Sequence, residues 1–180
     1  HGTRIAHISD LHLSRTVSSA YQHRCVERIN MLDVDIVVLT GDYITYDIRG
    51  RFREKVITLL GNIESRFGAY ACLGNHDYGV ALPGRRRGQL LRRLINGMEA
   101  SGIMVLRNES TVLEIDGHPL WFVGLGDLNV GDFNPEKAFA GVPTDQVTIA
   151  LMRNPRGVEH LSEYAANAIV SGHTHGRKAR

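Results

Sequence analysis

The sequence of 180 residues is poor in cysteine and has no long apolar run. Cys25 and Cys72 lie far apart, which excludes a disulfide framework and predicts two buried free thiols. No apolar stretch approaches the roughly 20 residues that cross a bilayer, and no signal peptide is visible. The net charge of +2 is too small to indicate nucleic-acid binding by itself. This composition is typical of a soluble globular domain.

The two ends of the chain are abrupt. It begins with His1 rather than Met, and it stops five residues after His175. We therefore expect one domain over residues 1–180, trimmed at both ends. The cellular location stays open: the domain is soluble as given, and peripheral or anchored attachment to a membrane in the native protein is an alternative.

Apolar periodicity predicts strands alternating with helices in the first half of the chain and mostly strands in the second half. Helices are expected at 19–32, 52–63 and 90–98, and strands at 4–9, 35–39, 69–73, 103–106, 111–115, 120–123, 147–152 and 168–170. This order predicts an α/β fold in which two mixed sheets pack face to face with helices outside.

Short polar motifs follow several of these strands. They are Asp10-Leu11-His12, Gly41-Asp42, Gly74-Asn75-His76-Asp77 and Gly172-His173-Thr174-His175. Carboxylate, amide and imidazole groups are ligands of divalent metal ions. Because strand ends from distant parts of a sequence can converge on one edge of a sheet, the motifs predict a metal site there. The glycines fit sharp turns where no side chain is tolerated.

In order and spacing, these motifs over residues 3 to 176 resemble the calcineurin-like metallophosphoesterases. The resemblance implies a four-layer α/β/β/α sandwich with a dinuclear metal centre. It implies that the first metal binds Asp10, His12 and His175, that Asp42 bridges both metals, and that Asn75 and His173 bind the second. It also implies that His76 is no ligand but protonates the leaving oxygen or stabilises the transition state.

The implied activity is hydrolysis of a phosphodiester or pyrophosphate bond by a metal-activated hydroxide. The resemblance to the family implies manganese as the metal. Zinc, iron and magnesium are alternatives, because mixed oxygen and nitrogen ligands accept several divalent ions. A catalytically impaired binding module and a nuclease of the same fold are the alternatives. The oligomeric state and the substrate stay undetermined.

One position departs from the family pattern. A third metal-binding histidine normally follows a strand in a sequence like L-x-H-x-P, and here Arg153 takes its place before Asn154 and Pro155. Arginine only donates hydrogen bonds and cannot bind a metal. Three alternatives follow. The second metal site is weakened or empty, or Arg153 supplies positive charge, either in place of that metal or by binding a substrate phosphate. In the third alternative, Asn154 serves as a weak ligand. We favour the impaired or empty second site.

A second departure concerns the orientation of His76. Many relatives place a carboxylate three residues after the bridging aspartate to orient this ring, and here that position is Thr45. The orientation matters because it fixes the tautomer. Asp47 and Asp77 are both candidates to replace the missing carboxylate.

Arginines crowd the segment after the His76 motif. Arg85, Arg86, Arg87, Arg92 and Arg93 fall on a predicted helix and the loop before it. They are either a solvated helix face or a surface for peripheral membrane contact, a lipid-linked or other phosphate-containing substrate, or, as a less favoured partner, nucleic acid. Residues 124–139 resemble the membrane-associated branch that includes UDP-2,3-diacylglucosamine pyrophosphatase. In that segment Asp127 and Asn129 are candidates to lie near the site, although loop carboxylates are usually solvated.

Overall fold

The computed structural model describes residues 2–17, 19–80 and 82–175, which form two four-stranded sheets. The first runs in the order β1 (Ile5–Ile8), β2 (Ile36–Thr40), β3 (Ala69–Cys72) and β4 (Ile103–Val105). The second contains β5 (Glu109–Ile115), β6 (His118–Gly124), β7 (Val147–Met152) and β8 (Ala168–Ser171). The predicted α/β class is confirmed. However, the first sheet is parallel rather than mixed, because a helix joins each of its strands to the next.

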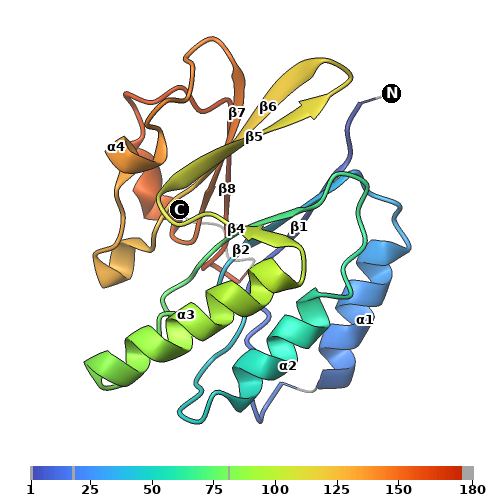
Figure 1. Cartoon of the computed structure of the whole chain (residues 1–180), viewed down its shortest axis with the longest axis vertical. Coiled ribbons are helices and arrows are strands. Elements are labelled where there is room, and N and C mark those ends of the chain that lie inside the picture. The colour runs from blue at the N-terminus through green and yellow to red at the C-terminus, as the bar shows by residue number, and fades with distance from the viewer. Residues whose placement is uncertain (1, 18, 81, 176–180) are drawn as a thin grey trace.

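The second sheet is mixed, as predicted, with β5 antiparallel to β6 and the other pairs parallel. Three helices lie side by side on the outer face of the first sheet: α1 (Ser19–Asn30), α2 (Arg51–Leu60) and α3 (Gly84–Ala100) (Figure 1). Beside the second sheet lies the short α4 (Pro135–Ala138), which contacts β5, and the described chain also contains two 3-10 turns, η1 (Leu128–Val130) and η2 (Pro155–His160). In the described part of the chain, no helix has the length and apolarity needed to cross a membrane.

The two faces of β2 show why the sheets and helices form layers. Ile36 and Val38 point toward the second sheet, whereas Val37 and Leu39 point toward the helices, and all four are fully buried. Alternation of this kind follows from the two-residue period of a strand. Between the sheets, the ring of Tyr70 in β3 stacks on Phe122 in β6 with centroids 4.1 Å apart. The sheets therefore pack face to face, and their carboxyl ends adjoin.

Strand β1 is the edge strand of its sheet and pairs with β2, so Ile5 and His7 are exposed while Ile8 is buried. Two local predictions were wrong. Helix α3 begins at Gly84, so Arg85 and the next two arginines lie in the helix rather than in a loop. Cys25 is half-buried on α1, although both thiols are free as predicted.

Candidate metal centre

Each polar motif follows a strand whose carboxyl end lies at the same edge of the two sheets. Asp10 and His12 follow β1, Asp42 follows β2, and Asn75 and His76 follow β3 in the first sheet. In the second sheet Arg153 follows β7, while His173 and His175 follow β8. Parallel strands present their carboxyl ends together, which is where open α/β sheets carry their sites. The topology thus brings residues 165 positions apart into one place.

The side chains meet in two overlapping groups. Ligand atoms of Asp10, His12 and His175 lie within 4.8 Å of one another, and so do those of His12, Asp42 and His76. Nε2 of His12 is 3.7 Å from Asp10 Oδ1 and 3.7 Å from Asp42 Oδ2, and Nε2 of His175 is 3.3 Å from Asp10 Oδ1. Carboxylate oxygens and imidazole nitrogens that face one another at this range can hold a divalent cation.

The backbone of the predicted ligands is unusual. In the described residues, eight non-glycine residues have positive φ, and five of them are predicted ligands. These are Asp10 (58°), His12 (47°), Asp42 (54°), His173 (74°) and His175 (48°). Left-handed backbone is unfavourable for residues with a side chain and clusters at functional sites. The concentration of such residues here therefore supports a functional role for the strand ends.

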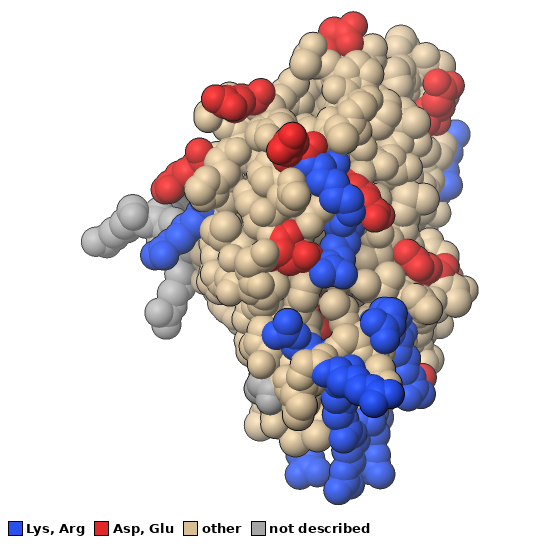
Figure 2. Space-filling view, turned by 60° about the vertical axis from the view of Figure 1, so that its left-hand side comes forward, with Lys and Arg blue, Asp and Glu red and all other residues tan. Residues whose placement is uncertain are grey.

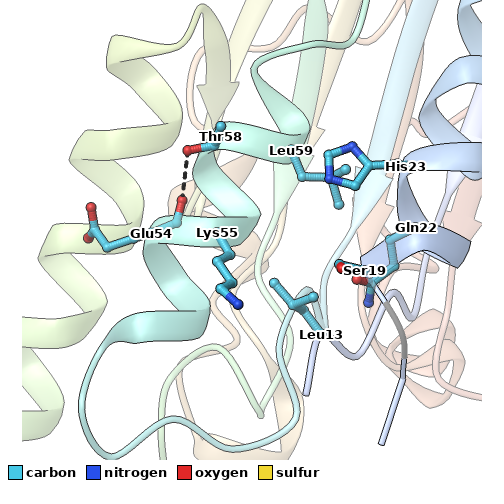
Figure 3. A pocket seen from close by; sticks show the side chains of 8 residues that line it. All are labelled: Leu13, Ser19, Gln22, His23, Glu54, Lys55, Thr58 and Leu59. Carbon is cyan, nitrogen blue, oxygen red and sulfur yellow. Dashed lines mark hydrogen bonds between the residues drawn. The ribbon is translucent and has the colours of Figure 1, made fainter. Parts of the chain in front are cut away.

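The Asp10–His12 segment is held in place by its neighbours. Its N–H groups donate to the second motif, from Asp10 to Gly41 O at 3.2 Å and from His12 to Asp42 O at 3.0 Å. Gln22 of α1, which is fully buried, donates from Nε2 to Leu11 O at 2.8 Å. Gln22 also borders a hollow of about 330 Å³ between α1 and α2, which Figure 3 shows from close by. Helix α1 thus helps to hold the backbone of the first motif in place.

Close approach of the loops explains the motif glycines. Gly41 has a φ of +84°, and a Cβ built there would lie 2.3 Å from Gly74 N. A Cβ on Gly74 would lie 2.2 Å from Asp42 Oδ1, and one on Gly172 would lie 1.9 Å from Ser9 Oγ. No side chain fits in these spaces, as the sequence predicted. At Gly74 and Gly172 the reason is crowding rather than a left-handed backbone.

Among the described residues, four buried side-chain acceptors have no hydrogen-bond partner: Nε2 of His12, Oε1 of Gln22, Oδ1 of Asn75 and Oδ2 of Asp127. A buried polar atom without a partner is costly, and a cation beside Asp10 would satisfy Nε2 of His12, which lies 3.7 Å from Asp10 Oδ1. The residues around Asp10 therefore fit one divalent ion. Among the described residues His173 belongs to neither group of candidate ligands, and its side chain is exposed.

Arg153 lies inside the site rather than beside it. Its side chain is 1% exposed, and Nη2 is 2.5 Å from both Asp10 Oδ1 and Asp42 Oδ2. Nη1 donates to Ser9 Oγ at 3.3 Å. Burial opposes the charge on Arg153, but its bonds to the two carboxylates outweigh this and raise its pKa. Conversely, burial of Asp10 is outweighed by His12, Arg153 and Ser9, which lower the pKa of that carboxyl far below its usual range.

The ring of His76 is oriented by main chain, not by a carboxylate. Its Nδ1 lies 2.7 Å from the carbonyl oxygen of Thr45. Neither predicted candidate does this: Asp47 accepts from the N–H groups of Phe52 and Arg53 at the start of α2. The second candidate, Asp77, instead accepts hydrogen bonds from the N–H groups of Asp42, Tyr43 and Gly74.

Asp127 is more buried than predicted. It is 1% exposed, and its Oδ1 accepts from the N–H groups of Asn129 and Val130 at the start of η1. Its Oδ2 is buried without a partner, and burial raises the pKa of this carboxyl. No local sequence pattern indicated this burial. Ser9 and Thr45 were likewise missed as groups that support the site.

Comparison with known proteins agrees with this geometry. Residues 3–177 match the family model described as calcineurin-like phosphoesterase. This chain belongs to that family. The fold also matches the NAD nucleotidase of Haemophilus influenzae, with a TM-score of 0.65 at 17% identity over 96% of this chain and 38% of that one. At this identity the match supports the fold alone.

Among curated family members, two relatives are informative. UDP-2,3-diacylglucosamine pyrophosphatase LpxG of Chlamydia trachomatis is 28% identical, over 98% of this chain and 64% of its own length. Phosphodiesterase YaeI of Escherichia coli is 29% identical, over 98% of this chain and 62% of its own length. The chain therefore spans a little over three fifths of the length of these relatives.

Proposed function

We propose that this chain is a metal-dependent phosphoesterase that cleaves a phosphodiester or pyrophosphate bond. The observation that carries the proposal is the convergence of Asp10, His12, Asp42 and His175, whose ligand atoms meet in two overlapping groups at the carboxyl ends of three strands, β1, β2 and β8. Membership of the family supports it, as do relatives named as a pyrophosphatase and a phosphodiesterase. Those four residues would hold the metal.

A divalent ion bound there would act as a Lewis acid on a phosphoryl oxygen and lower the pKa of bound water. The protein residues would do the rest. His76 is held by Thr45 O through its protonated Nδ1, so in the imidazolium form its Nε2 would carry the proton that goes to the leaving oxygen. The N–H of His76 donates to Asp42 Oδ1 at 3.1 Å, so the acid and the ligand keep a fixed spacing.

We infer that the centre holds one metal and that Arg153 provides the second positive charge. Asp42 is the expected bridge, yet its Oδ1 accepts from His76 N–H and its Oδ2 accepts from Arg153. The burial of Arg153 and its bonds to two carboxylates disfavour a grip on substrate phosphate. The side chain of Asn154 is not free to bind a metal, because its Oδ1 accepts from Arg156 N and its Nδ2 donates to Asn129. The second site, with Asn75 and His173, would therefore stay empty.

The test compares this chain with Arg153→His. Bound metal is counted by mass spectrometry after equilibration with Mn²⁺, and hydrolysis of bis-p-nitrophenyl phosphate is followed in parallel. We expect about one ion per unsubstituted chain and about two in the variant, because histidine restores a ligand. The exposed neighbour Arg156→His is the matched control and should keep the count of the unsubstituted chain.

The alternative of a binding module without turnover draws on the same buried arginine. In that case the unsubstituted chain would bind metal and hydrolyse nothing, and only Arg153→His would gain activity. Two ions in the unsubstituted chain would contradict the one-metal proposal. Absence of hydrolysis in both proteins, with bound metal in each, would contradict the proposed activity.

We further propose that the substrate is lipid-linked and reaches the site from a membrane surface. Arg85, Arg86 and Arg87 are exposed at the start of α3, and Figure 2 shows basic side chains gathered at that end of the molecule. Exposed apolar side chains lie in the loops that lead to α2 and α3: Tyr46, Ile48 and Val80 are each 45–50% exposed. Exposed basic and apolar groups together suit contact with an anionic bilayer. A nuclease would need a longer basic groove.

A further inference from the structure

Thr45 contacts two imidazoles through two different groups. Its carbonyl oxygen lies 2.7 Å from Nδ1 of His76, and its hydroxyl oxygen lies 3.2 Å from Nδ1 of His12. The same hydroxyl donates to the carbonyl oxygen of His12 at 3.2 Å. The two rings stand nearly perpendicular, with centroids 5.1 Å apart. One residue is thus placed to control both histidines.

Counting protons assigns the tautomer of His12. The hydroxyl of Thr45 has a single proton, and the carbonyl of His12 can only accept it. Toward the ring of His12 the hydroxyl oxygen must then accept, so Nδ1 of His12 carries the proton. Nε2 is left with a lone pair, and this atom is buried without a partner between Asp10 and Asp42. That arrangement is the one a metal ligand requires.

The same reasoning applies to His76 with a different acceptor. A carbonyl oxygen only accepts, so Nδ1 of His76 carries a proton and its Nε2 is the free ring nitrogen. This carbonyl belongs to the main chain, and Thr45 N is itself bonded to Leu13 O at 3.3 Å beside the Leu13–Ile44 bridge. A change of the Thr45 side chain should therefore spare His76 and affect only His12.

We propose that Thr45 is a positioning residue that fixes His12 for metal binding through its hydroxyl and His76 through its carbonyl. The inference rests on the proposed function for the role of the metal. It explains how this chain works with threonine at the position where relatives carry a carboxylate. The hydroxyl acts on the metal ligand, and the main chain replaces the carboxylate.

The first test needs no metal and no substrate. Nitrogen-15 NMR of the imidazole side chains distinguishes the two neutral tautomers of His12 at high pH. In the metal-free, unsubstituted protein we expect the proton on Nδ1. Thr45→Val, which keeps the shape but removes the hydroxyl, should shift His12 to a mixture or to the Nε2–H form, and Thr45→Ser should restore it. A proton on Nε2 of His12 in the unsubstituted protein would overturn the proposal.

The second test measures Mn²⁺ affinity by calorimetry in the same three proteins. Loss of a group that orients a metal ligand typically weakens metal binding by about 10- to 100-fold, which is the effect expected for Thr45→Val. Thr45→Ser should bind nearly as tightly as the unsubstituted protein.

Equal Mn²⁺ affinity in all three proteins would sink the proposal. Circular dichroism checks that each variant is folded, and Thr45→Ser keeps the test decisive if the valine variant is not. Since the tautomer and the affinity are measured without turnover, a protein that hydrolyses nothing but shows both shifts would refute the proposed activity alone.

Discussion

Asp77 Oδ2 accepts a hydrogen bond from the backbone N–H of Asp42 at 2.8 Å, which ties the second predicted metal-binding motif, Gly41-Asp42, to the third, Gly74–Asp77. The same oxygen accepts from Gly74 N at 2.9 Å, and Oδ1 accepts from Tyr43 N at 3.0 Å. Asp77 is fully buried, so these donors have no water to replace it. The conformation of both loops depends on this one carboxylate.

Replacement of Asp77 by asparagine should therefore destabilise the protein strongly. The amide keeps one acceptor oxygen but turns an NH₂ group toward backbone donors that are buried. Each buried donor left without a partner costs about 1–3 kcal/mol, so we expect a loss of about 3 kcal/mol or more in the free energy of unfolding. Urea unfolding at neutral pH measures it. Asp116→Asn, at an exposed turn, is the matched control and should change stability by less than about 0.5 kcal/mol.

The buried ion pairs of Arg153 predict a dependence of stability on metal. Arg153→Met leaves Asp10 and Asp42 without their neutralising partner, and breaking a buried pair costs about 3–5 kcal/mol. In metal-free buffer we expect a loss of this order in urea unfolding. Added Mn²⁺ should recover more stability in the variant than in the unsubstituted chain, because the cation replaces the lost charge.

The control is an ion pair of similar length on the surface. Arg93 Nε lies 2.6 Å from Glu54, but both side chains are more than half exposed. Arg93→Met should therefore change the free energy of unfolding by no more than about 1 kcal/mol, with or without metal. If the two variants lost equal stability, burial of Arg153 would not be the reason for its effect.

The residues at the strand ends were predictable from the sequence, whereas contacts between residues of different sheets and contacts made by the main chain were not. The strand ends with Asp10, Asp42 and Asn75 were visible because polar residues follow short apolar runs. The contact of Arg153 with Asp10 was not visible, since it joins residues from two sheets and depends on their packing. Thr45 was missed for a related reason: a main-chain carbonyl carries no sequence signal, so the expected carboxylate appeared to be absent rather than replaced.

Acid sensitivity should arise in part at Asp132. Its carboxylate accepts from Arg107 at 2.7 and 2.9 Å and from the hydroxyl of Tyr78 at 2.5 Å. Burial opposes ionisation, but these partners outweigh it and lower the pKa of Asp132 in the folded protein. A lowered folded pKa gives stability that is present above the unfolded value of about 4 and is lost as the pH falls toward the folded value.

Unfolding by urea at pH 7 and pH 3 tests this sign. Asp132→Asn should be less stable than the unsubstituted chain at pH 7, because Arg107 loses its charged partner. It should also lose less stability between the two pH values, because the group that titrates is gone. An equal or steeper loss in the variant would assign the acid sensitivity to other carboxylates.

The proposed membrane contact through the start of α3 predicts a simple dependence of vesicle binding on salt. Substitution of Arg85, Arg86 and Arg87 by glutamine removes three exposed charges. Each arginine near an anionic surface contributes about 1 kcal/mol, so the triple variant should bind phosphatidylserine vesicles about a hundredfold more weakly in a sedimentation assay. A double variant of Arg24 and Arg28, exposed on α1, removes charge elsewhere and should bind like the unsubstituted chain.

Because screening shortens the range of these charges, raising the salt should abolish the difference between the triple variant and the unsubstituted chain. Equal binding of both at low salt would rule out α3 as the contact surface.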